Sequence, residues 1–270
     1  MFINAGKSSC QWEGYTLILP AISVGNVGQL TADLLISTLQ LDSVGHLHDE
    51  SILPLCGNDP YASTGVAQGV LVTSAEVYEC KEKELVIIQQ RAPLVKGKQR
   101  DFRKKLLAWI KECKFSQVVL LSSTHSHERV DSQITGSPFR FLSTASLSIS
   151  ADDLKWQRLE TREDMWGVQR QTAEETIPEE AKGVYIPGGG MAKRFFEDCC
   201  REQVPLAVLM VFCSEGDNIP DAMMLVSELN KWIKVVQEAE NQSQQQRRSP
   251  WKKPKSWDLL YGSAVESSLY

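Results

Sequence analysis

The sequence has no hydrophobic run long enough for a membrane-spanning helix and no long stripe of lysine and arginine. A transmembrane helix needs about 20 consecutive apolar residues, and no stretch of the 270 residues approaches that length. The formal net charge is −5, and the one basic run, residues 247–255, lies near the C-terminus. Nucleic-acid phosphates are usually collected by a broad basic surface. We therefore expect neither a membrane nor a nucleic acid as partner.

The cysteines lack the even number and regular spacing that a disulfide scaffold shows. The seven cysteines are an odd number, they follow no regular spacing, and Cys199 and Cys200 are adjacent. This pattern suits neither a disulfide framework nor a zinc knuckle. The first 14 residues also lack the charged-then-apolar plan of a secretory signal peptide. We expect a protein of a reducing compartment, the cytoplasm and nucleus.

The common phosphate-binding and hydrolase motifs are also absent. No G-x-x-x-x-G-K-[ST], H-E-x-x-H or G-x-S-x-G motif occurs in the sequence, although each of these would carry a defined chemistry. An apolar stretch does run into a helix through Gly25 and Gly28, but a dinucleotide fingerprint needs three glycines as G-x-G-x-x-G. Gly25 and Gly28 are equally explained by a tight turn and close packing of a helix on a strand.

A second glycine turn, residues 188–190, lies between a short apolar stretch and a predicted helix. Three glycines free the backbone to wrap around an anion, and Lys193 and Arg194 lie in the first turn of that helix. A strand-to-helix turn with unusual dihedral angles explains the same residues. We favour the turn, and a nucleotide sensor that uses residues 25–28 or 188–190 stays as an alternative.

Histidine is scarce, and its placement is the best indication of catalysis. The four histidines form two H-x-H pairs, His46 with His48 and His125 with His127, each at the end of a predicted strand. If those strands are neighbours, the four imidazoles could hold a metal ion, or Ser123 could act as a nucleophile beside a histidine. Loop histidines that bind nothing explain the pattern more simply. A metal-dependent or serine-type hydrolase is therefore the alternative function.

Predicted strands and helices alternate along most of the chain. Buried strands are expected at residues 15–24, 43–49, 116–124 and within 205–218, and helices from residue 27, over 100–113 and over 219–236. Two apolar stretches on either side of the charged residues 81–84 predict an antiparallel hairpin. The alternation predicts a three-layer α-β-α domain with a mostly parallel central sheet plus a β-hairpin.

Three parts of the chain differ in composition. Residues 1–236 are expected to form a single α/β domain, in which the charged residues 150–182 are a surface insertion. Residues 237–250 are expected to be a polar, flexible linker, because such a segment cannot bury enough apolar surface to order itself. Residues 251–270 form an extended tail rich in large side chains: Trp251, Trp257, Leu259, Leu260, Tyr261, Leu269 and Tyr270. Such side chains beyond a linker dock either on the domain or on a partner.

Seven motifs follow one another along nearly the whole chain: "YTLILPAISVGNVGQLTADLLISTL" from Tyr15, "GNDPYA" from Gly57, "LLSSTHSHER" from Leu120, "SPFRFL" from Ser137, "IPGGGMAK" from Ile186, "SEGDNIPDAMMLV" from Ser214 and "SWDLLYGS" from Ser256. In this order they resemble the family of assembly chaperones of the 20S proteasome α-ring. The charged residues 150–182 and the linker carry none of these motifs.

The resemblance implies a three-layer α/β domain without enzymatic activity and without a cofactor. It implies a heterodimer with proteasome assembly chaperone 1, which holds α subunits of the 20S proteasome while their ring forms and prevents off-pathway dimers of α-rings. We expect the heterodimer face to include a helix with exposed apolar residues. The residues by themselves do not distinguish between three functions, namely a chaperone, a hydrolase and a nucleotide sensor. The resemblance favours the chaperone.

The resemblance also gives the C-terminal tail a role. In related chaperones and proteasome activators, a hydrophobic–tyrosine–any-residue motif at the C-terminus enters pockets between adjacent α subunits. The present sequence ends in Leu269 and Tyr270, so its tyrosine is the last residue instead of the penultimate one. We expect Leu269 and Tyr270, together with Trp257, Leu260 and Tyr261, to form a partner-binding anchor.

Overall fold

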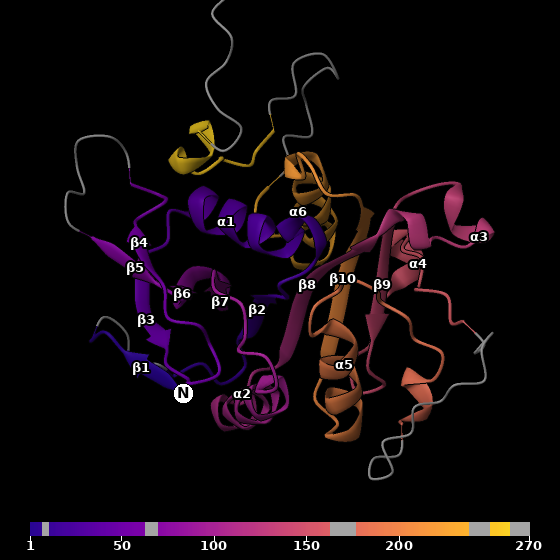
Figure 1. Ribbon diagram of the computed structural model, residues 1–270, viewed down its shortest axis with the longest axis horizontal. Helices are drawn as coiled ribbons and strands as arrows, with labels where there is room; N and C mark the ends of the chain where they lie inside the picture. The colour runs from indigo at the N-terminus through magenta and orange to yellow at the C-terminus, as the bar shows by residue number, and fades with distance from the viewer. Residues whose placement is uncertain (7–10, 63–69, 163–176, 238–248, 260–270) are drawn as a thin grey trace, which may run out of the picture.

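One mixed sheet of eight strands forms the centre of the molecule, in a computed structural model that describes residues 1–6, 11–62, 70–162, 177–237 and 249–259. The strands lie in the order β1-β3-β6-β7-β2-β8-β10-β9 (Figure 1). The central four are parallel, and the strands on both sides of them are antiparallel. Their bounds are β1 Phe2–Asn4, β2 Thr16–Pro20, β3 Ser43–Leu47, β6 Ala75–Cys80, β7 Leu85–Gln90, β8 Gln117–His125, β9 Phe139–Ser143 and β10 Leu206–Cys213.

The parallel strands are buried along nearly their whole length because both of their faces are covered. Every residue of β10 is buried, and so are the residues of β8 between its two ends. A parallel strand between two helical layers requires such a run, whereas a strand with one wet face alternates. The register pairs Leu206 with Val118 and Cys213 with His125. The carboxyl ends of β8 and β10 therefore lie side by side.

Two pairs of longer helices cover the two faces of the sheet. Helices α1 (Val27–Leu39) and α6 (Ile219–Ile233) lie on one face, and α2 (Gln99–Cys113) and α5 (Ala192–Arg201) lie on the other (Figure 1). Each face has its own apolar core, which confirms the predicted three-layer α/β fold. Shorter helical segments are α3 Asp131–Ile134, α4 Ala151–Leu154, and the 3-10 turns Val24–Asn26, Lys81–Lys83, Ser126–Glu128, Glu179–Ala181 and Lys255–Leu259. Within the described ranges no helix has the length and apolar character of a bilayer span.

The predicted hairpin is confirmed, and the sheet carries further antiparallel strands at both edges. Strands β6 and β7 pair antiparallel around residues 81–84. A second small sheet pairs β4 (Cys56–Asn58) with β5 (Leu71–Thr73), and the edge strand β9 pairs with β10. Strand β9 carries a fully buried Arg140, whose Nε lies 3.2 Å from a carboxylate oxygen of Glu160. A charge at the second of only five positions hides such a strand from a hydropathy pattern.

Part of the predicted surface insertion packs into the domain. Of residues 150–182, the structure describes 150–162 and 177–182. Trp156 is buried, its ring lies tilted against that of Phe139 with 5.0 Å between the centroids, and its indole N–H donates to Glu228 over 2.9 Å. Leu159 is also buried, and its amide donates to the carbonyl of Phe141 in β9. The stretch around Trp156 and Leu159 is therefore a cover for the edge strand, unlike the predicted insertion.

Candidate functional site

Three loops that carry sequence motifs meet at the carboxyl ends of β2, β8 and β10. Open α/β sheets commonly bind their ligands at this edge. The amide of Val24 donates to the carbonyl of Gly188 over 2.9 Å, and the amide of His125 donates to the carbonyl of Pro187 over 3.3 Å. Both glycine turns and the His125 loop are thus brought together, and this edge is the first candidate for a site.

The hydroxyl groups at this edge are bonded to main-chain oxygens. Ser123 donates to the carbonyl of Val24 over 2.5 Å, and it accepts from Ser23 over 2.7 Å. Thr124 donates to the carbonyl of Pro187 over 2.8 Å. Ser123 and Thr124 are at most 1% exposed. A hydroxyl that is buried and already donates to a carbonyl cannot attack a substrate, so these residues lock the loops together.

The glycines of the first turn serve the backbone, as the sequence interpretation proposed. Gly25 has φ = 65°, a conformation that favours glycine. A Cβ atom at Gly28 would lie 2.4 Å from the carbonyl oxygen of Leu121 in β8. Helix α1 can therefore approach β8 closely because residue 28 has no side chain.

The second glycine turn presents carbonyl oxygens to its neighbours. Val24 donates to the carbonyl of Gly188, and Ser122 donates to the carbonyl of Gly189 over 3.3 Å. The amide of Gly189 donates within the turn, to Ile186. Carbonyl oxygens repel an anion, so the nucleotide alternative finds no support in this turn.

The two histidine pairs are far apart in the sheet. His46 lies in β3 and His125 ends β8, and strands β6, β7 and β2 lie between them. The rings of His125 and His127 are 4.9 Å apart between centroids. In the part of the chain that the structure describes, no three potential ligands of the His, Cys, Asp and Glu type gather around one point. The alternative of a four-histidine site is therefore wrong, because its strands are not neighbours.

A buried polar cluster explains the GNDPYA motif. The phenol of Tyr61 donates to a carboxylate oxygen of Asp33 over 2.5 Å, and Gln89 and Arg91 donate to the same oxygen over 2.6 and 2.9 Å. Burial, and next the Asp33 carboxylate, raise the pKa of Tyr61 well above its ordinary value, so the phenol stays a neutral donor. The cluster ties residues 59–61 to helix α1.

The buried thiols are poor nucleophiles. Burial raises the pKa of Cys213 to about 11 and that of Cys200 to about 12, and burial also raises the pKa of Cys199 well above its usual range. A thiol reacts as its thiolate, which these groups do not form near neutral pH. Cys213 at the end of β10 and Cys199 and Cys200 in the last turn of α5 are therefore packing residues.

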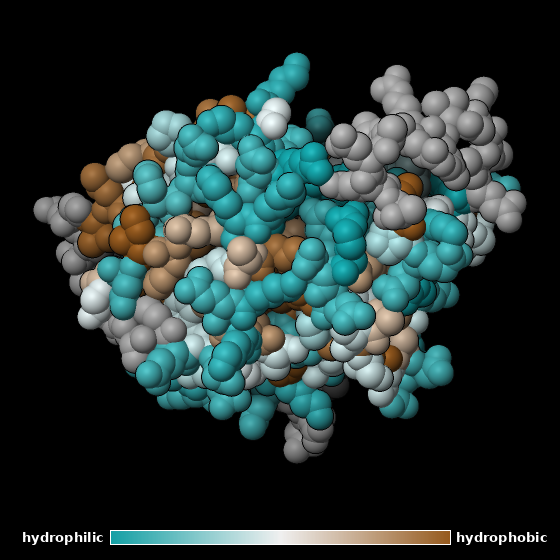
Figure 2. Space-filling view, turned by 90° about the horizontal axis from the view of Figure 1, so that it is seen from below, coloured by the Kyte–Doolittle hydropathy of each residue, from teal (hydrophilic) through white to brown (hydrophobic). Residues whose placement is uncertain are grey.

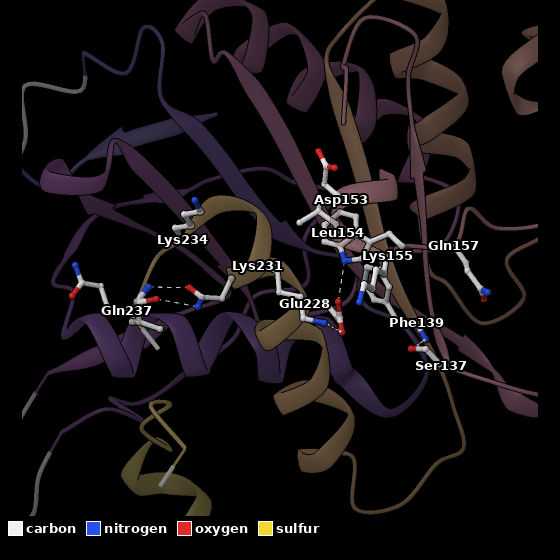
Figure 3. A pocket seen from close by; sticks show the side chains of 13 residues that line it. Ser137, Phe139, Asp153, Leu154, Lys155, Gln157, Glu228, Lys231, Lys234 and Gln237 are labelled. Carbon is white, nitrogen blue, oxygen red and sulfur yellow. Dashed lines mark hydrogen bonds and ion pairs between the residues drawn. The ribbon is translucent and has the colours of Figure 1, made fainter. Parts of the chain in front are cut away.

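A surface groove of about 1200 Å³ lies between α4 and the end of α6 (Figure 3). Its walls include Phe139, Trp156 and Lys231. Several of the polar groups in the walls bond one another: Trp156 donates to Glu228, and the amide side chain of Asn230 pairs with the main chain of Val236 over 2.9 and 3.0 Å. The groove is open and its polar groups do not converge, which is unlike a small-molecule site.

Exposed apolar side chains gather around the small β4–β5 sheet. We call Leu53, Leu55, Val70 and Leu71 the hairpin patch; they are 43%, 44%, 53% and 59% exposed. Ser74 holds the patch in place by accepting from the amide of Leu55 and donating to the carbonyl of Leu53, each over 2.7 Å. Figure 2 shows apolar surface at the left edge, the side of β4 and β5 in Figure 1. Exposed apolar side chains that gather in one region make it a candidate interaction surface.

The patch lies on strands and loops, whereas the sequence interpretation expected a helix. Among the large apolar side chains exposed in the described ranges, Ile134 of α3 alone is helical. The signal in the sequence was a pair of apolar stretches, residues 52–55 and 70–72, beside segments too short to be covered on both faces. We assigned no partner face to them because apolar stretches usually indicate core.

The predicted tail anchor is divided. Trp257 is 7% exposed and belongs to the apolar core under α1 and α6, so its ring packs on its own domain in this structure, and its predicted role in binding a partner stays a prediction. The reason is physical: a large aromatic ring finds apolar surface on its own domain. Leu260, Tyr261, Leu269 and Tyr270 lie outside the described residues.

Comparisons with known proteins agree over the whole chain. The family model described as "PAC2 family" matches residues 17–246. A protein of Danio rerio named "Proteasome assembly chaperone 2" is 42% identical over 274 residues, 100% of both chains. One of the same name from Nematostella vectensis is 51% identical over 243 residues, 87% of this chain and 97% of its own.

The solved structures show the same fold. Pyrococcus furiosus PbaA, described as an archaeal homolog of proteasome-assembly chaperone, superimposes with a TM-score of 0.60 at 16% identity, over 85% of each chain. At that identity the likeness speaks for the architecture alone. The family model and the full-length relatives go further, and on their account this chain belongs to the PAC2 family.

Proposed function

We propose that this protein is a chaperone of proteasome assembly that works by binding and not by catalysis. The observation that carries the proposal is the match, along the whole chain, to relatives named proteasome assembly chaperone 2. The closed carboxyl edge of the parallel strands supports the same conclusion. There the hydroxyls of Ser123 and Thr124 bond to the main chain, where an enzyme of this architecture would keep reactive groups open.

In detail, the protein forms a heterodimer with proteasome assembly chaperone 1 in the cytoplasm and nucleus. The pair holds α subunits of the 20S proteasome during ring formation and prevents off-pathway dimers of α-rings. The hairpin patch is suited to a partner chain, because its side chains are apolar and exposed and lie on or beside the two strands of one small sheet. Burying such a patch supplies the central, desolvated contacts that carry most of the energy of an interface.

The C-terminal residues contact the α subunits. Leu269 and Tyr270 end the chain with an apolar and an aromatic side chain beside the terminal carboxylate. Aromatic anchors in pockets are where interfaces concentrate their binding energy. Leu260 and Tyr261 of the same tail add apolar surface.

Native affinity capture from eukaryotic cell extract, with partners identified by mass spectrometry, tests the proposal. The full-length chain is compared with a chain that lacks Leu269 and Tyr270. We expect the full-length chain to recover a second assembly chaperone and proteasome α subunits. The truncated chain recovers the second chaperone and loses α subunits. Recovery of neither partner by the full-length chain overturns the proposal, and unchanged α subunits with the truncated chain overturn the role of the tail.

A further inference from the structure

Residues 249–259, which we call the strap, lie folded on the surface of the domain, although they follow the polar residues 238–248 in sequence. Every third residue of the strap turns inward: Trp251, Pro254 and Trp257 are buried. The residues between them, including Lys252, Lys253 and Ser256, are exposed. The two tryptophans belong to the same apolar core as helices α1 and α6. The strap is thus anchored by aromatic side chains and carries its charge outward.

Polar contacts attach the strap to three separate elements. The indole N–H of Trp251 donates to the hydroxyl of Ser227 in α6 over 3.2 Å. The amide of Lys252 donates to the hydroxyl of Thr38 at the end of α1 over 2.9 Å. The amide of Ser256 donates to the carbonyl of Pro60 over 3.2 Å. The strap therefore crosses the domain from α6 over α1 to residues 59–61, as its gold trace above α1 shows (Figure 1).

The last of these contacts is to a rigid part of the domain. Pro60 precedes Tyr61, whose phenol bonds the buried carboxylate of Asp33 over 2.5 Å. Arg91 contacts both groups, at 2.9 Å from Asp33 and 3.0 Å from Tyr61. A loop held by a buried, mutually bonded cluster has one position. The strap therefore ends at a defined position beside the small β4–β5 sheet, where Ser256 contacts Pro60.

We propose that the strap is a positioning device for the end of the chain, with Trp251 and Trp257 as its positioning residues. The inference rests on the proposed function, in which Leu269 and Tyr270 contact proteasome α subunits. Eleven residues follow Leu259, whereas 33 residues follow Gln237, the last described residue before the strap. Since each residue spans at most about 3.5 Å, the strap confines Tyr270 to within about 40 Å of residue 259. A chain released from Gln237 would reach about 115 Å.

A shorter tether raises the local concentration of its end. For a flexible tether longer than the span it must cover, that concentration falls as the −3/2 power of tether length. Releasing the strap lengthens the tether threefold, so tail binding weakens about fivefold. It also removes the direction given by the exit beside Pro60. The strap therefore sets where, and how strongly, the tail can engage an α subunit that the domain already holds.

The docking itself is tested by hydrogen exchange of the full chain in complex with its partner chaperone. The amides of Lys252 and Ser256 donate to the domain, so peptides covering 249–259 exchange slowly. In a W251A/W257A variant these peptides exchange at the rate of an unprotected chain, while β8 and β10 keep their protection and show that the domain is folded. The matched control K253A alters an exposed strap residue and leaves exchange unchanged. Unprotected exchange in the wild-type strap overturns the proposal.

The functional consequence is tested by titrating α subunits against the same variants. We expect W251A/W257A to bind about fivefold more weakly than wild type and K253A to bind as wild type. Deleting residues 238–248 from W251A/W257A shortens its tether to 22 residues and should recover about twofold. A lost packing contact alone would not be recovered by shortening the linker. Wild-type affinity in W251A/W257A, or no recovery on shortening, overturns the positioning role.

The outcomes separate the strap from the proposed function. If the wild-type chain binds no α subunits, the proposed function fails and the positioning role fails with it, even where exchange shows a docked strap. If the wild-type chain binds α subunits and the strap variants bind equally well, the proposed function stands and the positioning role alone fails.

Discussion

The carboxyl edge of the parallel strands and the β4–β5 region differ in which side chains they bury. The first buries polar side chains, and the second exposes apolar ones. At the sheet edge, Ser123 and Thr124 are buried and donate to carbonyls of the neighbouring loops. At the β4–β5 sheet, the four apolar side chains of the hairpin patch are 43–59% exposed. The edge at which α/β domains usually bind ligands is therefore sealed, and apolar surface is presented elsewhere. This contrast supports the proposal that the β4–β5 region, and not the edge of the parallel strands, contacts a partner.

The largest effect should come from opening the sealed edge. We expect Gly28→Ala to lower the free energy of unfolding by about 3 kcal/mol, because its Cβ would lie 2.4 Å from a backbone oxygen that cannot move aside. The matched control is Gly57→Ala in β4, where no heavy atom lies within 4 Å of the added Cβ; it should cost less than about 0.5 kcal/mol. Urea unfolding measures both. Equal stabilities for the two variants would contradict the sealed edge.

The next effect concerns the hairpin patch. L55D and L71D together place two charges on exposed apolar positions, so we expect stability to stay within about 1 kcal/mol of wild type. Binding of the partner chaperone should weaken about 30-fold, since each charge must be desolvated in the interface. The control I134D changes an exposed apolar residue of α3, away from the patch. Calorimetric titration compares them, and wild-type affinity in L55D/L71D would remove the patch from the interface.

A smaller, pH-dependent effect is expected at the edge strand β9. Burial alone would raise the pKa of Glu160, but hydrogen bonds from Gln133 and Arg140 outweigh it and lower the pKa below its ordinary value. A carboxyl whose pKa is lowered by folding contributes stability above its unfolded pKa, about 4.3, and that stability is lost as pH falls through the folded pKa.

E160Q should therefore be less stable than wild type at pH 7 and should approach it below about pH 4. The side chain of Glu160 is 35% exposed, so solvent screens the pair and we expect a loss of about 1 kcal/mol at pH 7. Thermal unfolding between pH 3 and pH 7 measures the difference. A difference that stays constant over this range would show that the carboxylate of Glu160 is not held by Arg140.

The smallest effect should follow from removing every histidine. The variant with alanine at His46, His48, His125 and His127 should capture α subunits as wild type does, because the two pairs lie on strands separated by three others. Metal content, measured by elemental mass spectrometry on the wild-type chain, complements the capture experiment. Stoichiometric metal together with loss of capture in the variant would revive the hydrolase.

The sequence predicts best those helices and strands whose own apolar pattern shows that they are buried. Strand β10 is a continuous apolar run, and Phe102, Leu106 and Ile110 of α2 recur at helical spacing and are buried. Strand β9 escaped prediction because Arg140 depends on Glu160, twenty residues away, to be buried. Strand β1 has three residues and exists because it pairs with β3. The local sequence pattern does not show which distant strand a short strand pairs with, or which distant residue neutralises a buried charge.

For the candidate functional regions, the sequence indicated which residue types are involved, but it did not show where those residues lie in the fold. A tight turn with close packing of a helix on a strand was one of the explanations that residue type allowed for Gly25 and Gly28, and the structure agrees with it. The docking of Trp251 and Trp257 could not be read from the tail, because the surface that receives them is formed by α1 and α6 together. The hairpin patch could not be predicted from the sequence either, because the exposure of an apolar residue depends on the whole fold.

One measurement tests most directly whether the protein acts by binding. Purified α subunits are allowed to assemble with increasing amounts of the chain and its partner chaperone, and native mass spectrometry counts the complexes. The account predicts that α-subunit complexes contain the chain and increase in proportion to it until one chain is present per complex. Assembly driven to completion by a small fraction of that amount, with the chain found in no complex, would contradict the account, because the chain would then promote assembly without being bound by the α subunits.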